Sequence, residues 1–251
     1  MRRSIRSAGA AALAWLVAFA PAVAVSQDAA DTPVGAFSAS RPGGAFPAGW
    51  EPLVFPRIAR HTTYSLVADP ERGTVVEARA DASASGMVRR MSVDPRGRTL
   101  AWSWKTERVL KRGDVTRKDG DDYPVRVYVT FRLPAERLSA LDRMKQAAGR
   151  ALFGDELPDA GLNYIWDTRA PAGTIVANPY TDRVRMIVVE SGRERTGRWI
   201  DYERDVAADW RAAFGGEAPP IAGIAIMTDT DNTGETARSW YGDIALRRTR
   251  R

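Results

Sequence analysis

The sequence predicts a mainly β protein in which two antiparallel sheets pack face to face, with one or two short helices in the connections. Short runs of β-branched and aromatic residues follow one another along most of the 251 residues, and turn signals such as Asp94-Pro-Arg-Gly97 separate them. In residues 125–131, apolar side chains at every second position alternate with Arg126, Tyr128 and Thr130, which is typical of a strand with one buried face. The strands do not alternate with helices as parallel βαβ units do. These observations favour a β-sandwich.

The amino terminus predicts an export signal. Three basic residues lie within Met1–Arg6, no charged residue follows before Asp28, and the apolar stretch ends in Ala22-Val-Ala24. Signal peptidase reads small residues at these two alanine positions, so we expect residues 1–24 to be a cleaved signal peptide. The alternative is a retained membrane anchor, but the apolar run is short for a spanning helix, which needs about 20 apolar residues. The mature protein is expected to be periplasmic or secreted, with no stable membrane insertion.

The mature chain is expected to hold one domain. Residues 25–50 are rich in Ala, Ser, Pro and Gly and predict an irregular linker with one short strand around Val34–Phe37. No linker composition recurs after residue 50, so residues 51–246 are expected to form a single β-sandwich domain. Residues 247–251 form a basic tail with four arginines.

Nine strands and two helices are expected in this domain. The strands cover Thr74–Ala80, Met87–Val93, Thr99–Thr106, Val125–Phe131, Leu162–Trp166, Arg183–Val189, Gly197–Ile200, Ile221–Thr228 and Trp240–Leu246. Apolar residues at helical spacing mark Pro134–Ala151 and a second segment that Asp201 caps and that runs to Phe214. The pair Gly215-Gly216 is expected to end this second helix.

The net charge of +6 does not point to nucleic acid. Seven of the 37 basic residues lie in the first six and last five positions, which leaves 30 basic residues against 31 acidic ones in between. Nucleic-acid binding needs a clustered basic surface, and the body of the chain has no such run. The absence of Cys excludes disulfides, zinc–thiolate sites and lipid anchors on cysteine, and the single His leaves at most one imidazole for catalysis.

Five motifs occur in order along the chain: Leu100-Ala-Trp-Ser-Trp104, Asp121-Asp-Tyr-Pro-Val-Arg-Val-Tyr-Val129, Leu162-Asn-Tyr-Ile-Trp166, Met227-Thr-Asp-Thr-Asp-Asn-Thr-Gly234 and Tyr241-Gly-Asp-Ile244. Together they resemble the bacterial exported family catalogued as domain of unknown function 3047, over about residues 35–246. The family has no assigned reaction, so the resemblance transfers no catalytic residue. It implies a jelly-roll sandwich similar to galactose-binding-like domains and carbohydrate-binding modules, and architecture of this kind does not fix function.

An oxygen-rich loop near the carboxyl end predicts a structural calcium site. Asp229, Asp231 and Asn232 lie close together before Gly234, and Asp243 on the last predicted strand is the nearest further ligand. Calcium takes about six to eight oxygen ligands, of which this loop supplies only a part. The alternative is an Asx-type turn, in which these side chains bond local backbone amides. No other cofactor is expected.

Candidate ligand-binding residues lie on the predicted wet face of the 125–131 strand. Arg126 and Tyr128 project from that face, and Asp122 lies before the strand. Such a row of donors and a ring at period-two spacing suits a sheet-face groove that binds an extended glycan.

Tryptophans near predicted loops or strand ends are the candidates for an exposed aromatic rim, and they are Trp50, Trp199 and Trp240. Trp102 and Trp104 lie two positions apart on one strand and could also stack on sugar rings. Leu100 on the same face favours a core position for this pair.

Three classes of function remain. The sequence favours an exported, non-catalytic protein that binds a glycan or another cell-envelope polymer. The alternative is a carbohydrate-active hydrolase or lyase, and a further alternative is a structural partner in envelope assembly. Asp121 and Asp122 invite an acid/base interpretation, but neighbouring strand residues point to opposite faces, so these carboxylates should not converge on one substrate atom. We expect instead that one of them caps the turn and the other pairs with a base such as Arg126.

Overall fold

Two β-sheets make up the part of the protein that the computed structural model describes, residues 31–134, 136 and 159–249. Sheet A contains β1 (Thr32–Gly35), β3 (Thr63–Asp69), β4 (Gly73–Asp81), β6 (Arg98–Thr106), β11 (Ile200–Asp205) and β13 (Thr236–Arg248). Sheet B contains β2 (Trp50–Leu53), β5 (Ala84–Val93), β7 (Arg126–Phe131), β8 (Ala160–Asp167), β9 (Ile175–Asn178), β10 (Thr181–Ser191) and β12 (Ile221–Asp229).

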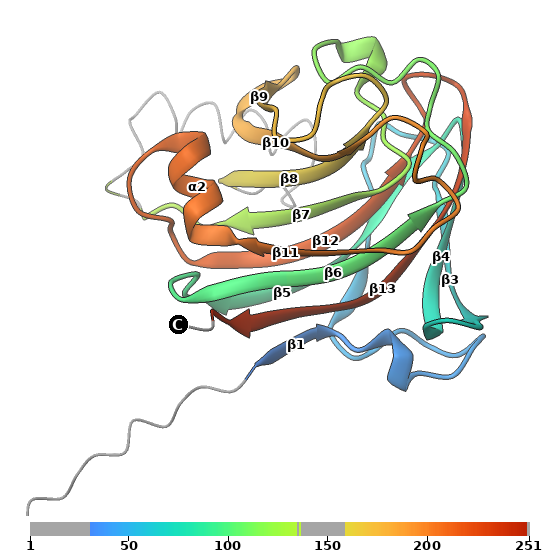
Figure 1. The fold of residues 1–251 in the computed structure, drawn as a ribbon, viewed down its shortest axis with the longest axis horizontal. Helices are drawn as coiled ribbons and strands as arrows, with labels where there is room; N and C mark the ends of the chain where they lie inside the picture. The colour runs from blue at the N-terminus through green and yellow to red at the C-terminus, as the bar shows by residue number, and fades with distance from the viewer. Residues whose placement is uncertain (1–30, 135, 137–158, 250–251) are drawn as a thin grey trace, which may run out of the picture.

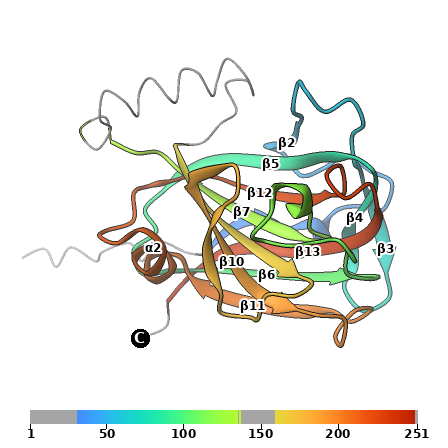
Figure 2. The ribbon, with the colours of Figure 1, turned by 90° about the horizontal axis from the view of Figure 1, so that it is seen from above.

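The strand order is β11-β6-β13-β4-β3 in sheet A, where β1 also pairs with β13, and β2-β5-β12-β7-β8-β10-β9 in sheet B. The described helical elements are the 3-10 turns η1 (Phe37–Ala39) and η2 (Lys118–Gly120) and the helix α2 (Val206–Phe214). Figures 1 and 2 show α2 at one end of the sandwich and β3 and β4 at the other. Within the described ranges, no helix is long and apolar enough to cross a membrane.

The core lies between the two sheets and confirms the predicted mainly β sandwich. In β7, the apolar side chains at alternate positions, including Val127 and Val129, are 0% exposed and face sheet A. From the facing strand β6, Trp102 and Trp104 are 3% and 0% exposed and belong to the same cluster. The tryptophan pair is therefore core, as Leu100 on the same face indicates.

One strand pairing departs from the predicted antiparallel pattern. Strand β10 runs parallel to β8, with Val184 opposite Gly161 and Ser191 opposite Asp167. All other strand pairings among the described residues are antiparallel. The parallel pair arises because β9 lies between β8 and β10 in the chain and forms the outer edge of the sheet, so β10 returns beside β8 in the same direction.

The predicted start of the second helix is wrong. Asp201 lies in β11, paired with Ser103 of β6, and the helix begins only after Asp205, whose side chain accepts a 2.9 Å hydrogen bond from the Ala208 amide. The predicted strand at Gly197–Ile200 is mostly turn, because β11 starts at Ile200. The helix does end at Gly215, which has a positive φ of 77°. The other predicted helix, Pro134–Ala151, lies almost wholly outside the described residues.

The short strand predicted around Val34–Phe37 is present as β1 (Thr32–Gly35), but the second half of residues 25–50 packs on the sandwich instead of forming a linker. Strand β1 pairs with β13 in sheet A, and Phe37 is 0% exposed against the core. Trp50 is 7% exposed, and its indole donates a 2.9 Å hydrogen bond to the Val34 carbonyl. The sandwich therefore begins near residue 32, where β1 starts. The Gly- and Pro-rich segment after β1 belongs to it, because the rings of Phe37 and Trp50 are buried. The predicted signal peptide, residues 1–24, lies outside the described residues.

Two tyrosine hydroxyls connect the sheets inside the core. Tyr241 of sheet A donates a 2.6 Å hydrogen bond to the Met227 carbonyl of sheet B and lies 2.8 Å from the Thr228 hydroxyl. Tyr64, also of sheet A, donates to the Ser85 carbonyl at 2.6 Å and accepts from the Thr228 amide at 3.0 Å. Both hydroxyls satisfy polar backbone groups of β5 and β12 that face the other sheet.

We predict that Tyr241→Phe destabilises the protein by about 1–3 kcal/mol, because the Met227 carbonyl and the Thr228 hydroxyl lose a partner in a buried place. Chemical denaturation measures the free energy of unfolding. Tyr128→Phe is the control, since Tyr128 is half-buried and its hydroxyl has no hydrogen bond among the described residues, and its effect is expected to stay within about 0.5 kcal/mol. Equal effects of the two substitutions would contradict this role of Tyr241.

Candidate functional site

Two long connections meet at one end of the sandwich: residues 107–125 between β6 and β7, and residues 230–235 between β12 and β13 (Figure 1). The Arg112 guanidinium donates a 2.8 Å hydrogen bond to the Thr233 carbonyl and so joins the two. The Tyr180 hydroxyl lies 3.0 Å from the Lys118 carbonyl and 2.9 Å from Asn232 Oδ1. These contacts enclose a polar cluster at the ends of β7 and β12.

Arg126 is the centre of this cluster. The register places it on the face of sheet B that points away from sheet A, opposite Met227 of β12, while Tyr128 on the same face lies opposite Asn163 of β8. Arg126 is 3% exposed and forms an ion pair with Asp229, which is 1% exposed. Its guanidinium lies 5.1 Å from the ring centroid of Tyr123 and 5.5 Å from that of Tyr128.

Asp122 anchors the β12–β13 connection. Its Oδ2 accepts a 2.6 Å hydrogen bond from the Thr233 amide, and its Oδ1 accepts from the Asn232 side chain at 3.0 Å and the Asn232 amide at 3.3 Å. A second hydrogen bond has its acceptor on β12: the Tyr123 amide of the 107–125 connection donates to Asp229 Oδ1, at the end of β12, at 3.2 Å. Both carboxylates of the 121–122 pair therefore bond distant segments, Asp122 the 232–233 backbone and Asp121 the Asn178 side chain, instead of capping the turn that contains them. Arg126 pairs with Asp229 and with neither Asp121 nor Asp122.

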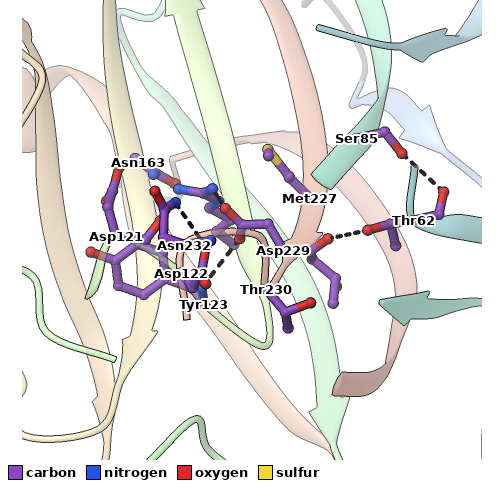
Figure 3. A network of polar contacts seen from close by, with 12 residues as sticks. Thr62, Ser85, Asp121, Asp122, Tyr123, Asn163, Met227, Asp229, Thr230 and Asn232 are labelled. Atoms are coloured by element: carbon purple, nitrogen blue, oxygen red, sulfur yellow. Dashed lines mark hydrogen bonds and ion pairs between the residues drawn. The ribbon is translucent and has the colours of Figure 1, made fainter. Parts of the chain in front are cut away.

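Several buried polar atoms of the cluster have no hydrogen-bond partner among the described residues. Nine buried side-chain atoms are in this condition, and six of them belong here: Asp121 Oδ1, the Tyr123 hydroxyl, Arg126 Nε and Nη1, Asn163 Oδ1 and Asp167 Oδ2. Figure 3 shows Asp121, Tyr123 and Asn163 in one group with Asp122, Asp229 and Asn232. Buried polar groups are normally paired, so six unpaired atoms in one place mark the site where a further polar molecule would be stabilised.

Burial changes the protonation behaviour of this cluster. Asp121 is 6% exposed, and burial raises the pKa of its carboxyl above the ordinary value, an effect that the charge of Arg126 opposes. Burial also raises the pKa of Tyr123, and the nearby Asp121 charge adds to this effect. The Tyr123 hydroxyl therefore stays protonated and can donate or accept a hydrogen bond.

The predicted ligand-binding residues of β7 lie in this cluster, but their exposure was predicted wrongly. Arg126 and Asp122 are 3% and 1% exposed, and Tyr128 is half-buried. The alternation of β7 is as predicted, but its outer face is covered at this end by the 107–125 connection instead of lying open to water. Whether these residues bind a ligand stays a prediction.

The predicted aromatic rim is only partly formed. Trp50 is buried between β1 and the core, so it is no rim residue. Trp199 and Trp240 come together on the outer face of sheet A, where the Lys105 ammonium lies 4.8 and 4.9 Å from their ring centroids. Lys105 also pairs with Asp69 at 2.8 Å. Trp199 donates to the same aspartate at 3.1 Å, so this surface satisfies its own polar groups.

The predicted calcium ligands do not all meet. Asp243 lies elsewhere, because its carboxylate accepts hydrogen bonds from the Ser38 amide at 2.8 Å and the Ser38 hydroxyl at 2.5 Å. Asp122 takes its place, and one oxygen each of Asp122, Asp229 and Asp231 lie within 4.8 Å of one another. The internal donors of this cluster already occupy the carboxylate oxygens of Asp122 and Asp229, so calcium would compete with them. Burial and the nearby Asp122 raise the pKa of Asp231.

Calcium binding stays a prediction, and thermal unfolding tests it. An ion that binds the folded protein raises Tm by mass action, so millimolar calcium should give a higher Tm than chelator. Asp231→Ala should remove this increment and leave the metal-free protein folded, because Asp231 is exposed. Identical melting curves in chelator and in calcium would refute the prediction.

Sequence reasoning missed Asn163 and Tyr123 as members of the site. Asn163 is the one polar residue inside the apolar run 162–166, and it is 0% exposed. A polar residue in a fully buried strand is a signal that the sequence does carry. Tyr123 gives no comparable signal, because only the path of the 107–125 connection brings its ring over Arg126.

The fold and the cluster define a β-sandwich with an enclosed polar site on one sheet face. The chain belongs to the family described as protein of unknown function (DUF3047), which matches residues 48–245. A comparison with curated proteins gives no match.

Solved structures with a similar fold include two carbohydrate-binding modules and an adhesin domain. A family 11 module from Clostridium thermocellum, in complex with a β-1,3-1,4-mixed-linked tetrasaccharide, has 10% identity and a TM-score of 0.40, with 87% of this chain and 96% of that chain covered. A xylan-binding domain from Paenibacillus barcinonensis has 9% identity and a TM-score of 0.36, covering 88% and 97%. The K3 adhesin domain of Lys-gingipain from Porphyromonas gingivalis has 10% identity and a TM-score of 0.41, covering 87% and 99%. Similarities this distant do not assign a ligand.

Proposed function

We propose that this protein binds a glycan, without cleaving it, at the cluster around Arg126. One observation carries the proposal: unpaired donors and unpaired acceptors lie buried in the same cluster. Arg126 offers two unpaired N–H groups, while Asp121 and Asn163 each offer an unpaired oxygen, none with a partner among the described residues.

The mixture of donors and acceptors selects the chemistry of the ligand. A bound cation would satisfy the oxygens of Asp121 and Asn163 but would leave the N–H groups of Arg126 unpaired. A bound anion would pair with Arg126 but would meet the carboxylates of Asp121 and Asp122. Hydroxyl groups donate and accept at once, so neighbouring sugar hydroxyls satisfy both sets. Ordered water can serve the same atoms when no sugar is bound.

We propose that a ligand reaches the cluster from the side of Tyr128 and Thr130. These two residues lie on the same face of β7 as Arg126 and are half-buried, whereas Arg126 is 3% exposed. A sugar ring placed here meets the Tyr128 ring, and its hydroxyls reach Arg126. Neutral hydrogen bonds contribute about 0.5–1.5 kcal/mol each and bonds to a charged group about 1.5–3 kcal/mol, so short oligosaccharides should bind weakly.

Asn163→Leu is the sharpest test of this proposal. Leucine keeps the branching of asparagine, and it removes both the buried oxygen that has no partner among the described residues and the 3.5 Å hydrogen bond from Asn163 Nδ2 to Met186 Sδ. We expect the free energy of unfolding to stay equal or rise, because an unpaired polar group is lost. Glycan binding, measured by calorimetry against a panel of envelope and plant polysaccharides, should weaken by about two- to twelvefold, the equivalent of one neutral hydrogen bond of about 0.5–1.5 kcal/mol.

Trp240→Ala is the matched control, because it changes the aromatic surface of sheet A and leaves the Arg126 cluster intact. Its glycan affinity should equal that of the unchanged protein. If Trp240→Ala loses glycan binding and Asn163→Leu keeps it, the glycan site lies on sheet A and not at the Arg126 cluster. No binding to any polysaccharide would favour the structural partner, and new reducing ends or unsaturated products would favour the hydrolase or lyase.

We further propose that the protein is exported. The support is the basic start, the uncharged apolar stretch and Ala22-Val-Ala24 in the sequence. The expected mature chain begins at Val25, in the periplasm or outside the cell. Intact-mass measurement on protein from its native host tests this, and retention of residues 1–24 would refute it.

A further inference from the structure

The Arg126 cluster holds more negative than positive charge. Asp121, Asp122 and Asp229 are 6%, 1% and 1% exposed, and Arg126 is the one buried cation among the described residues of the cluster. Its ion pair goes to Asp229. Within the described part of the chain, Asp121 and Asp122 have no ion pair and accept hydrogen bonds from neutral groups only, from the Asn178 side chain to Asp121 and from the 232–233 segment to Asp122.

The nearest other cations do not change this balance. Arg112 and Lys118 are both exposed, so their charges are screened by water. Arg112 donates to the Thr233 carbonyl, and the Lys118 ammonium lies 5.4 Å from the ring centroid of Tyr180. Asp231, exposed at the edge of the cluster, adds a further negative charge. A ligand that reaches Arg126 therefore meets a field dominated by carboxylates.

From this charge distribution we infer that the site selects neutral and amino sugars and rejects acidic ones, an inference that rests on the proposed glycan binding at this cluster. A uronate or sulfate group would be buried beside Asp121 and Asp122, where water screens the repulsion poorly. An ammonium group on the sugar would instead supply the positive charge that the cluster lacks. Arg126 does not attract acidic sugars strongly enough to reverse this preference, because its positive charge is already paired with the Asp229 carboxylate.

A matched oligosaccharide series tests the inference. The probes are cellohexaose, its amino counterpart chitosan hexamer and its uronic counterpart glucuronan hexamer, which share one linkage and differ in charge. The monosaccharides galactose, galactosamine and galacturonic acid form a second series, which has no linkage to differ. In the series that binds, we expect the amino sugar to bind at least about tenfold more tightly than the uronate, with the neutral sugar between them.

Asp121→Asn tests whether the buried charge causes the selectivity. Asparagine has the size of aspartate and can still accept the hydrogen bond from the Asn178 side chain. It should reduce the ratio of the amino-sugar affinity to the uronate affinity several-fold. The ratio is the readout because the lost acceptor oxygen weakens the binding of all three sugars in the same way. Glu203→Gln removes the same charge at an exposed position of β11 in sheet A, outside the cluster, and should leave the ratio unchanged.

The outcomes separate the two proposals. A uronate that binds as tightly as its neutral counterpart, or a ratio that Asp121→Asn does not change, would overturn the selectivity and leave glycan binding intact. An absence of binding in both series, neutral sugars included, would overturn glycan binding at this cluster and the selectivity with it.

Discussion

The ion pair between Arg126 and Asp229 is the interaction on which the end of this sandwich depends. Both charges are buried, and removing one partner of such a pair costs about 3–5 kcal/mol, because the other charge is left in a place without water. Arg126 stands at the start of β7 and Asp229 at the end of β12, so the pair joins two neighbouring strands of sheet B. The 107–125 and 230–235 connections then close over it, each held by hydrogen bonds to the other.

The inter-sheet tyrosines position this ion pair from the core side. Tyr241 bonds the Met227 carbonyl and Thr228, the two residues before Asp229, and it accepts a 3.4 Å hydrogen bond from the Arg126 amide. The backbones that carry both charged side chains are therefore fixed by one hydroxyl of sheet A. These hydrogen bonds hold the backbone on both sides of the ion pair, so the proposed site would need little rearrangement to bind a ligand.

The surface around Trp199 and Trp240 on sheet A and the Arg126 cluster on sheet B differ in how many of their polar groups have a hydrogen-bond or ion-pair partner. On sheet A, the cations Arg72, Lys105 and Arg238 all lie over Trp199 or Trp240. Each of these cations also has a carboxylate partner: Asp201, Asp69 and Glu77, respectively. On sheet B, donors and acceptors of the Arg126 cluster stay unpaired among the described residues although they are buried. A satisfied surface gains little from a ligand, whereas an unsatisfied buried cluster gains each hydrogen bond that the ligand supplies. This difference supports the proposed glycan site on sheet B, on the face of β7 where the period-two pattern of Arg126 and Tyr128 also predicts it.

The sequence by itself determined the sandwich, because period-two alternation fixes which side chains face the core whatever the topology. It predicted the burial of Trp102 and Trp104, most of the strands and the family. It also placed Arg126 and Tyr128 together on one face of β7. Only the tertiary structure decided that this face is covered, that Asp229 and not Asp122 pairs with Arg126, and that Asp243 bonds Ser38 instead of joining the acidic loop. These contacts join residues more than 100 positions apart through long connections, and no local periodicity encodes the path of such a connection.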